Sequence, residues 1–121
     1  MILGLRTAVY HTPDLAVGKA FYAKILGFAP YFDEPFYVGF AVGGFELGLI
    51  PDGKPGPGGS EAYWGVENAA SAAAKLAELG AVPQGEIQDV GGGIKVARFA
   101  DPFGNIFAVI ENPHFKVADV R

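Results

Sequence analysis

Apolar and polar residues along this chain form two successive rounds of strand-like and helix-like segments. The first round opens with a short apolar run at 2–10, which is typical of a strand. Residues 14–26 then place apolar side chains at helical spacing, with Asp14 as a suitable N-cap and Gly27 as a stop. We therefore predict a strand followed by a helix.

Three β-rich runs complete this round. They read "FAPYFD", "FYVGFAV" and "FELGLI", and they are separated by Pro35 and by the pair Gly43-Gly44. Aromatic and β-branched residues favour strands, whereas Gly and Pro break them. The pattern predicts an antiparallel meander after the helix.

The second round starts after the stretch "PDGKPGPGGS", which is rich in Gly and Pro and has no apolar anchor. "EAYWGV" indicates a strand, and residues 68–80 indicate an Ala-rich helix capped by Asn68 and stopped by Gly80. The runs "VPQGEIQDV", "GIKVARFA" and "NIFAVIE" predict three further strands. This order repeats that of the first round.

The two rounds align with a single-residue shift inside the helix. The alignment places Asp14 on Asn68, Gly27 on Gly80, Pro30 on Pro83, and Phe45-Glu46 on Phe107-Ala108. We predict an α+β fold of two tandem βαβββ modules that form a pseudo-twofold, concave eight-stranded sheet. The modules should span about 1–51 and 61–113, with a linker at 52–60 and a tail at 114–121.

Composition narrows the classes of function. The chain has 121 residues, enough for one core, and half of them are apolar. A net charge of −4 and the lack of basic clusters argue against nucleic acid, and no apolar run is long enough to span a membrane. Cysteine is absent, which excludes disulfides and thiolate ligands. With no export signal visible, we expect a cytoplasmic protein.

Three phrases in the expected order resemble the vicinal oxygen chelate superfamily. They are "TPDLAVGKAFYAKILGF", "VENAASAAAKLAELGA" and "DPFGNIF", and the likeness covers nearly the whole chain. This superfamily includes glyoxalase I, bleomycin-resistance proteins, fosfomycin-resistance enzymes and extradiol dioxygenases. The resemblance implies the duplicated fold predicted above, with a cleft shared by the two modules.

The resemblance also implies where a metal would bind. Family members with a metal hold it on the first and fourth strands of each module, and these positions correspond to Thr7, Glu46, Glu61 and Ala108. Histidine or a comparable ligand is usual at the first and third positions, and glutamate at the fourth. This chain therefore departs from the pattern, with at most two of four ligands.

A divalent ion that activates a substrate needs three or more suitable ligands. Of the two histidines, His11 lies near a strand end, on the face of Thr7, and His114 lies in the predicted tail. We expect no cofactor, although Glu46 and Glu61 together with water could hold Mg²⁺.

Without a metal, Glu46 and Glu61 could act as an acid-base pair, because two nearby carboxylates raise one another's pKa. The alternative is structural: Glu61 would be exposed, and Glu46 would pair with Arg98 or bind water. The motif around Asp101, Pro102, Gly104 and Asn105 is expected to be a turn with no role in chemistry.

Strand alternation predicts which other residues line the cleft. Tyr63, Gly65, Gly48 and Ile110 should face inward, with Tyr63 and Ile110 as ligand contacts alongside Thr7, His11 and Ala108. His11 could instead cap the helix that begins at Asp14. Four residues should face the helices, namely Tyr10, Trp64, Phe107 and Val109. The pattern leaves the facing of Phe36, Tyr37 and Phe40 open.

Three functions fit these features. The first is a metal-free module that binds a small organic molecule in an apolar cleft, and a small cation would suit its acids and aromatics. The second is a metal-dependent glyoxalase-like lyase or a dioxygenase, and the third is an enzyme that uses Glu46 and Glu61 alone. The resemblance also implies a homodimer, in which modules could swap across the linker.

Overall fold

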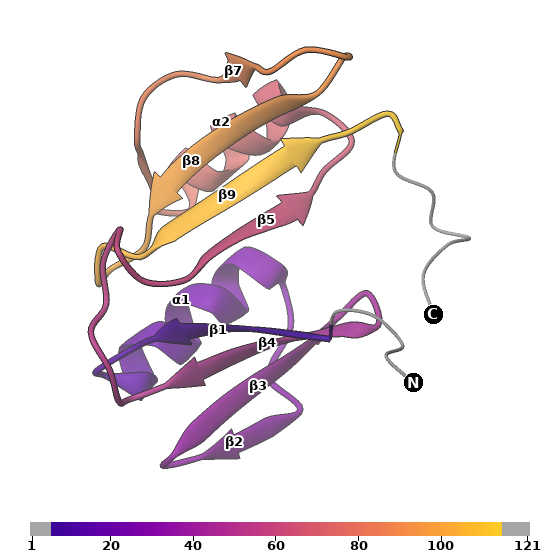
Figure 1. The fold of residues 1–121 in the computed structure, drawn as a ribbon. Coiled ribbons are helices and arrows are strands. Elements are labelled where there is room, and N and C mark those ends of the chain that lie inside the picture. Colours follow the sequence, from indigo (N-terminus) through magenta and orange to yellow (C-terminus); the bar gives the residue numbers. More distant parts are fainter. Residues whose placement is uncertain (1–5, 115–121) are drawn as a thin grey trace.

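A computed structural model describes residues 6–114 of the chain, and its elements follow the predicted order (Figure 1). Residues 2–5 of the first predicted strand lie outside the described part, as does the predicted tail beyond His114. In the described residues, no helix is long and apolar enough to cross a membrane.

Both predicted helices are confirmed, and their ends have the expected caps. Helix α1 (Leu15–Leu26) starts where the Asp14 side chain accepts a hydrogen bond of 3.2 Å from the Val17 N–H. It stops at Gly27, whose φ of 86° is the left-handed conformation that glycine adopts readily. Helix α2 (Ala69–Glu78) starts in the same way, with Asn68 as its N-cap.

The first module forms a four-stranded mixed sheet in the order β1-β4-β3-β2. Its strands are β1 (Thr7–His11), β2 (Phe32–Glu34), β3 (Tyr37–Val42) and β4 (Phe45–Ile50). β1 runs parallel to β4, and the other neighbours are antiparallel. This parallel pairing places Thr7 beside Glu46.

The second module repeats this order as β5-β9-β8-β6. Its strands are β5 (Glu61–Gly65), β6 (Val82–Pro83), β7 (Gln88–Asp89), β8 (Lys95–Ala100) and β9 (Ile106–Glu111). The prediction of one strand at 82–90 is wrong in detail, because β6 and β7 are separate and pair with different parts of β8. Pro83 offers no N–H for pairing, and Gly85 has a φ of 88°.

The predicted α+β class and the repeat of strand order are confirmed. In the described residues, however, the strands form two separate hydrogen-bonded sheets of four and five strands rather than one continuous sheet. The edge strands β1 and β5 do not pair through their backbones, although the Ala62 N–H of β5 donates a hydrogen bond of 3.3 Å to the Tyr10 hydroxyl of β1. The two modules must therefore be held together by other contacts.

One apolar core joins both modules on the side of the sheets that faces the helices. Tyr10, Phe107 and Val109 are buried in it and Trp64 packs against it, as predicted. Tyr22 of α1 lies with its ring centroid 5.9 Å from that of Phe107 in the second module. Burial of these large rings is a main source of stability in such a fold.

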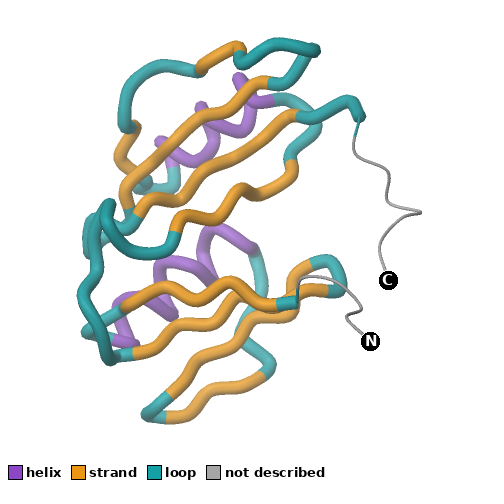
Figure 2. The backbone as a smooth tube through the Cα atoms, in the orientation of Figure 1, coloured by secondary structure: helices purple, strands orange, loops and turns teal. Residues whose placement is uncertain are grey.

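The turn at residues 101–105 makes polar contacts that also connect the modules. Tyr22 donates a hydrogen bond of 2.8 Å to buried Asp101, and the Asn105 side chain donates one of 2.8 Å to the His11 carbonyl. Asn105 also accepts from the Gly56 N–H in the loop between the modules, at 2.9 Å. The loops that meet here lie along one edge of the molecule (Figure 2).

Candidate functional site

The first sheet carries a pocket of about 430 Å³ on the face that points away from the helices. Its floor is a row of three neighbouring residues on adjacent strands, because Ala41 pairs with Glu46 and Glu46 pairs with Thr7. The lining residues are Arg6, Thr7, Tyr31, Ala41, Gly44, Phe45 and Glu46. A pocket of this size can hold a small organic molecule.

The Glu46 carboxylate is the chemical centre of this pocket and accepts three hydroxyl hydrogen bonds. Tyr31 donates to Oε2, whereas Tyr37 and Thr7 donate to Oε1 at 2.6 and 3.2 Å. A carboxylate has about four acceptor positions, so at least one remains for a ligand. The sequence pattern identified Glu46 and Thr7, left the facing of Tyr37 open and did not identify Tyr31.

These hydrogen bonds fix the charge of the cluster. The bond from Tyr31, and next that from Tyr37, lower the pKa of Glu46, although partial burial acts in the opposite direction. The hydrogen bond to Glu46 is the main cause that raises the pKa of Tyr31. The pKa of Tyr37 is also raised, mainly by burial and to a smaller extent by its hydrogen bond to Glu46. At neutral pH the cluster is therefore one carboxylate surrounded by neutral hydroxyls.

Two glycines make room for the tyrosines. Gly39 and Gly48 pair directly across β3 and β4. A methyl group on Gly48 would collide with the Tyr37 hydroxyl, and one on Gly39 would lie 2.9 Å from Glu46 Oε2. The absence of side chains lets the Tyr37 ring lie over the sheet and reach Glu46. The small residues Gly39 and Ala41, which alternate with larger ones and lie on the same strand face as Tyr37, were the sequence signal that could have revealed this.

Aromatic rings next to Glu46 lie outside the core. Phe32 contacts Phe36 and Tyr37 edge to face, with centroids 6.1 and 6.0 Å apart. Tyr31 and Phe36 are 64% and 65% exposed, far more than packing alone would leave them. The facing that the sequence left open is thus settled: Tyr37 faces the carboxylate, Phe40 is buried in the core, and Phe36 faces solvent.

The second module places Glu61 differently from the prediction. Glu61 pairs in register with Ile106, whereas Tyr63 pairs with Ala108. Since Ala108 corresponds to Glu46, the residue equivalent to Thr7 is Tyr63, two positions beyond Glu61. No local pattern in the sequence sets the register of β5 against β9, and this caused the error.

Glu61 forms an ion pair with Arg98, the residue that one sequence-based alternative paired with Glu46. Arg98 Nε lies 2.8 Å from Glu61 Oε1, so the alternative in which Arg98 pairs with Glu46 is wrong, whereas the exposure that it assigned to Glu61 is confirmed. Glu61 does not line the pocket around Glu46. The two carboxylates therefore do not share one pocket in the single chain, contrary to what an acid-base pair requires.

Of the other predicted ligand contacts, Ala108 has no exposed surface, so a ligand cannot touch it in the single chain. It lies between Tyr63 and Arg98 in the register of the sheet, and its short side chain does not reach past them. Ile110 is half-buried and Tyr63 is 51% exposed. Their contact with a ligand stays a prediction.

His11 holds the loop between the modules. Its Nδ1 donates a hydrogen bond of 2.8 Å to the Asp52 carbonyl, and its ring packs against Gly53. The alternative that His11 caps α1 is wrong, since Asp14 does so. A role of His11 in ligand binding stays a prediction.

The side chains at the family's metal positions do not fit a divalent ion. Thr7 offers a hydroxyl that already donates to Glu46, its counterpart Tyr63 offers a phenol hydroxyl, and Ala108 offers no donor atom. Glu61, which was expected at the position of Tyr63, is paired with Arg98. Between residues 6 and 114, no three His, Asp or Glu side chains gather into a possible metal site. Metal chemistry would need several such ligands at one point.

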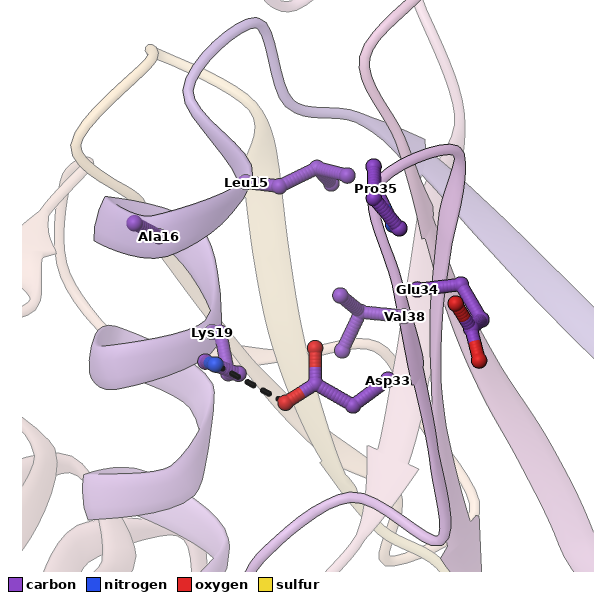
Figure 3. A pocket seen from close by; sticks show the side chains of 7 residues that line it. All are labelled: Leu15, Ala16, Lys19, Asp33, Glu34, Pro35 and Val38. Carbon is purple, nitrogen blue, oxygen red and sulfur yellow. Dashed lines mark hydrogen bonds and ion pairs between the residues drawn. The ribbon is translucent and has the colours of Figure 1, made fainter.

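A second hollow, of about 340 Å³, lies between α1 and the β2–β3 hairpin (Figure 3). Leu15 and Pro35 approach one another across it, and Lys19 Nζ lies 2.8 Å from Asp33 Oδ2. Because its lysine is neutralised by this ion pair, the hollow offers less specific chemistry than the Glu46 pocket. The ion pair fixes to α1 the hairpin that carries Tyr37.

The sequence matches the family described as Glyoxalase/Bleomycin resistance protein/Dioxygenase superfamily over residues 4–109. No curated protein matches the sequence.

Solved structures share the fold at low identity. A glyoxalase-related enzyme from Fulvimarina pelagi has 21% identity and a TM-score of 0.74, with 93% of this chain and 90% of that chain covered. A superfamily member from Sphaerobacter thermophilus has 22% identity and a TM-score of 0.74, covering 90% and 97%. A protein from Agrobacterium tumefaciens named lactoylglutathione lyase has 17% identity and a TM-score of 0.75, covering 91% and 94%.

The repeated modules define a protein of the vicinal oxygen chelate type. The chain belongs to the Glyoxalase/Bleomycin resistance protein/Dioxygenase superfamily.

Proposed function

We propose that this protein binds a small organic molecule in the pocket around Glu46 and does so without a resident metal ion. The observation that carries this proposal is the carboxylate held by Tyr31, Tyr37 and Thr7 within a pocket of about 430 Å³. Such a combination of a shaped hollow and a few convergent polar groups is typical of ligand sites.

Binding is favoured over acid-base catalysis by the state of the two carboxylates. The hydrogen bonds that Glu46 accepts from the three hydroxyl groups lower its pKa and make it a weak base near neutral pH. Glu61 is held by Arg98 outside this pocket. Neither group is arranged as the proton carrier that the enzymatic alternative needs.

A thermal-shift screen of small ring compounds, followed by calorimetry, tests the binding function. A compound that binds the native state raises its melting temperature. We expect hits whose stabilisation is lost or strongly reduced in Glu46→Gln and kept in Glu86→Gln, which removes an exposed carboxylate elsewhere. Hits that stabilise the wild type and Glu46→Gln equally would contradict the assignment of the site.

Metal analysis of the purified protein tests the second part of the proposal. We expect far less than one Ni, Zn, Mn, Fe or Mg ion per chain, and no change in melting temperature on treatment with a chelator. A near-stoichiometric ion that disappears in Glu46→Gln would instead support the lyase or dioxygenase alternative.

We also propose a cytoplasmic homodimer. The support is that large aromatic residues remain exposed in the single chain, including Phe36 in the turn between β2 and β3 and Tyr63 on β5. A second copy could cover these rings and bring its own second module to the Glu46 pocket. Light scattering during size-exclusion chromatography should give twice the monomer mass of 12.7 kDa, and a single-chain mass would contradict the dimer.

A further inference from the structure

We propose that the ligand of the Glu46 pocket is an organic cation, a protonated amine or amidinium attached to an apolar group. This inference rests on the proposed binding function and adds the chemical class of the ligand. It follows from which hydrogen-bonding groups in the pocket are already in use.

The hydroxyl donors near the carboxylate are all occupied. Tyr31, Tyr37 and Thr7 each have one hydroxyl proton, and each donates it to Glu46. What they leave toward a ligand is oxygen lone pairs, together with the remaining acceptor position of the carboxylate. A ligand that only accepts hydrogen bonds finds no free hydroxyl donor here, whereas an ammonium group finds several acceptors.

The net charge of Glu46 and its hydroxyl partners also favours a cationic ligand. Glu46 carries a negative charge, and its three hydroxyl partners carry none. The other charged residue of the pocket, Arg6, is already engaged in an interaction of its own. Because Arg6 is a like charge for a cationic ligand, its removal in Arg6→Gln should tighten cation binding.

Besides the carboxylate of Glu46, the pocket has an aromatic ring that can bind a cation, namely the exposed ring of Tyr31. It lines the pocket, is 64% exposed, and is held in place by its bond to Glu46. Aromatic faces attract organic cations, and this attraction adds to that of a nearby carboxylate. The apolar group of the ligand would pack on this ring and on the neighbouring Ala41.

Three probes of nearly equal size separate charge from shape: benzylammonium, benzyl alcohol and benzoate at pH 7 and low salt. Each is titrated into ¹⁵N-labelled protein, and the amide shifts of Thr7, Ala41 and Glu46 report binding in the pocket. We expect benzylammonium to bind about tenfold more tightly than benzyl alcohol, since charge-assisted hydrogen bonds are roughly twice as strong as neutral ones. Benzoate should bind most weakly, and added salt should reduce the preference for the cation.

Glu46→Gln keeps the shape of the side chain and removes its charge. It should weaken benzylammonium by about tenfold and benzyl alcohol by less, so that the cation loses its advantage. Glu86→Gln is the matched control and should keep the wild-type order. If Glu46→Gln does not fold, Tyr31→Leu takes its place and should weaken benzylammonium more than benzyl alcohol.

The outcomes separate the two proposals. If the three probes shift the pocket amides with equal affinity, or benzoate binds best, the cation proposal is wrong while the binding function stands. If no probe shifts these amides, both proposals fail.

Discussion

At the scale of single residues, the site depends as much on missing side chains as on present ones. Glu46 would be an ordinary exposed carboxylate if Tyr37 could not lie across the sheet to reach it. Gly48 and Gly39 allow this, because a methyl group at either position would meet Tyr37 or Glu46. Glycine costs stability inside a strand, so its presence at two paired positions indicates a steric requirement.

Gly48→Ala should therefore disturb the site. The added methyl group collides with the Tyr37 hydroxyl and should break its bond to Glu46. Forced overpacking of this kind costs about 1–3 kcal/mol in the free energy of unfolding. Urea denaturation and ligand titration measure the two effects. Gly65→Ala on β5 is the control, because a methyl group there meets no atom within 4 Å, and it should leave stability unchanged or slightly higher.

The ionisation of Glu46 predicts a pH dependence. Because its pKa is lowered in the folded state, folding favours the carboxylate form. Its contribution to stability should be present above the unfolded pKa of about 4.3 and should disappear as pH falls through the lower folded pKa. The difference in unfolding free energy between wild type and Glu46→Gln should thus be constant above about pH 5.5 and change below about pH 4. A difference that changes near pH 7 would contradict the lowered pKa.

At the scale of elements, the β2–β3 hairpin presents the aromatic part of the site while lying at the edge of its sheet. β2 has only three residues, all exposed, and in the part of the chain that the structure describes it pairs with β3 alone. The ion pair between Lys19 and Asp33 therefore provides one of the few links from β2 to the rest of the molecule.

Lys19→Gln should loosen this hairpin with little effect on global stability. Both partners of the ion pair are exposed, and such pairs contribute about 0–1 kcal/mol. We expect faster hydrogen exchange of the backbone amides of Phe32 and Glu34, whereas exchange in β9 should not change. Lys54→Gln in the loop between the modules is the control. Equal exchange in both variants would show that the ion pair does not hold the hairpin.

At the scale of the whole molecule, the turn at 101–105 does more than reverse the chain. Buried Asp101 accepts from Phe103 and Asn105 within the turn and from Tyr22 in the other module. The expectation of a turn is confirmed, but the turn also joins the two halves. Among residues 6–114 no edge strands pair between the sheets, so these polar contacts and the shared core carry the connection there.

Tyr22→Phe tests this connection. Loss of a buried hydrogen bond to a carboxylate should lower the unfolding free energy by about 1.5–3 kcal/mol. Burial, and next the charge of Asp101, raise the pKa of Tyr22, so folding favours its neutral form. That stability is complete below the unfolded tyrosine pKa of about 10 and is lost as pH rises above it. The alkaline loss of stability should accordingly be smaller in Tyr22→Phe.

Tyr63→Phe is the control for this variant, because Tyr63 is half-exposed. Its unfolding free energy should stay within about 0.5 kcal/mol of the wild type. A loss in Tyr63→Phe as large as that in Tyr22→Phe would show that the bond between the modules is not the cause.

Local signals in the sequence were enough for most of the fold. The caps at Asp14 and Asn68, the stop at Gly27 and the alternation along β5 and β9 all depend on near neighbours, and the structure confirms them. The broken strand at 82–90 is the exception, because pairing with β8 decides where a short strand can persist.

Only half of the candidate site could be predicted, because the residues that hydrogen-bond to Glu46 come from separate segments of the chain. The sequence identified Glu46 and its neighbour Thr7, whereas the bonds from Tyr31 and Tyr37 depend on how the hairpin lies over the sheet. The choice of Glu61 rather than Tyr63 as the counterpart of Thr7 failed for a similar reason. The register between parallel strands far apart in the chain has no local signal.

The sequence by itself determined the repeated elements, the core-facing side of β1, β4, β5 and β9, and the family, since these follow from periodicity and short motifs. Only the tertiary structure decided that Arg98 neutralises Glu61, that Ala108 is covered, and that Glu46 stands among hydroxyls. The physical reason is that side-chain charge and access depend on distances between segments, and these are set when the sheets assemble.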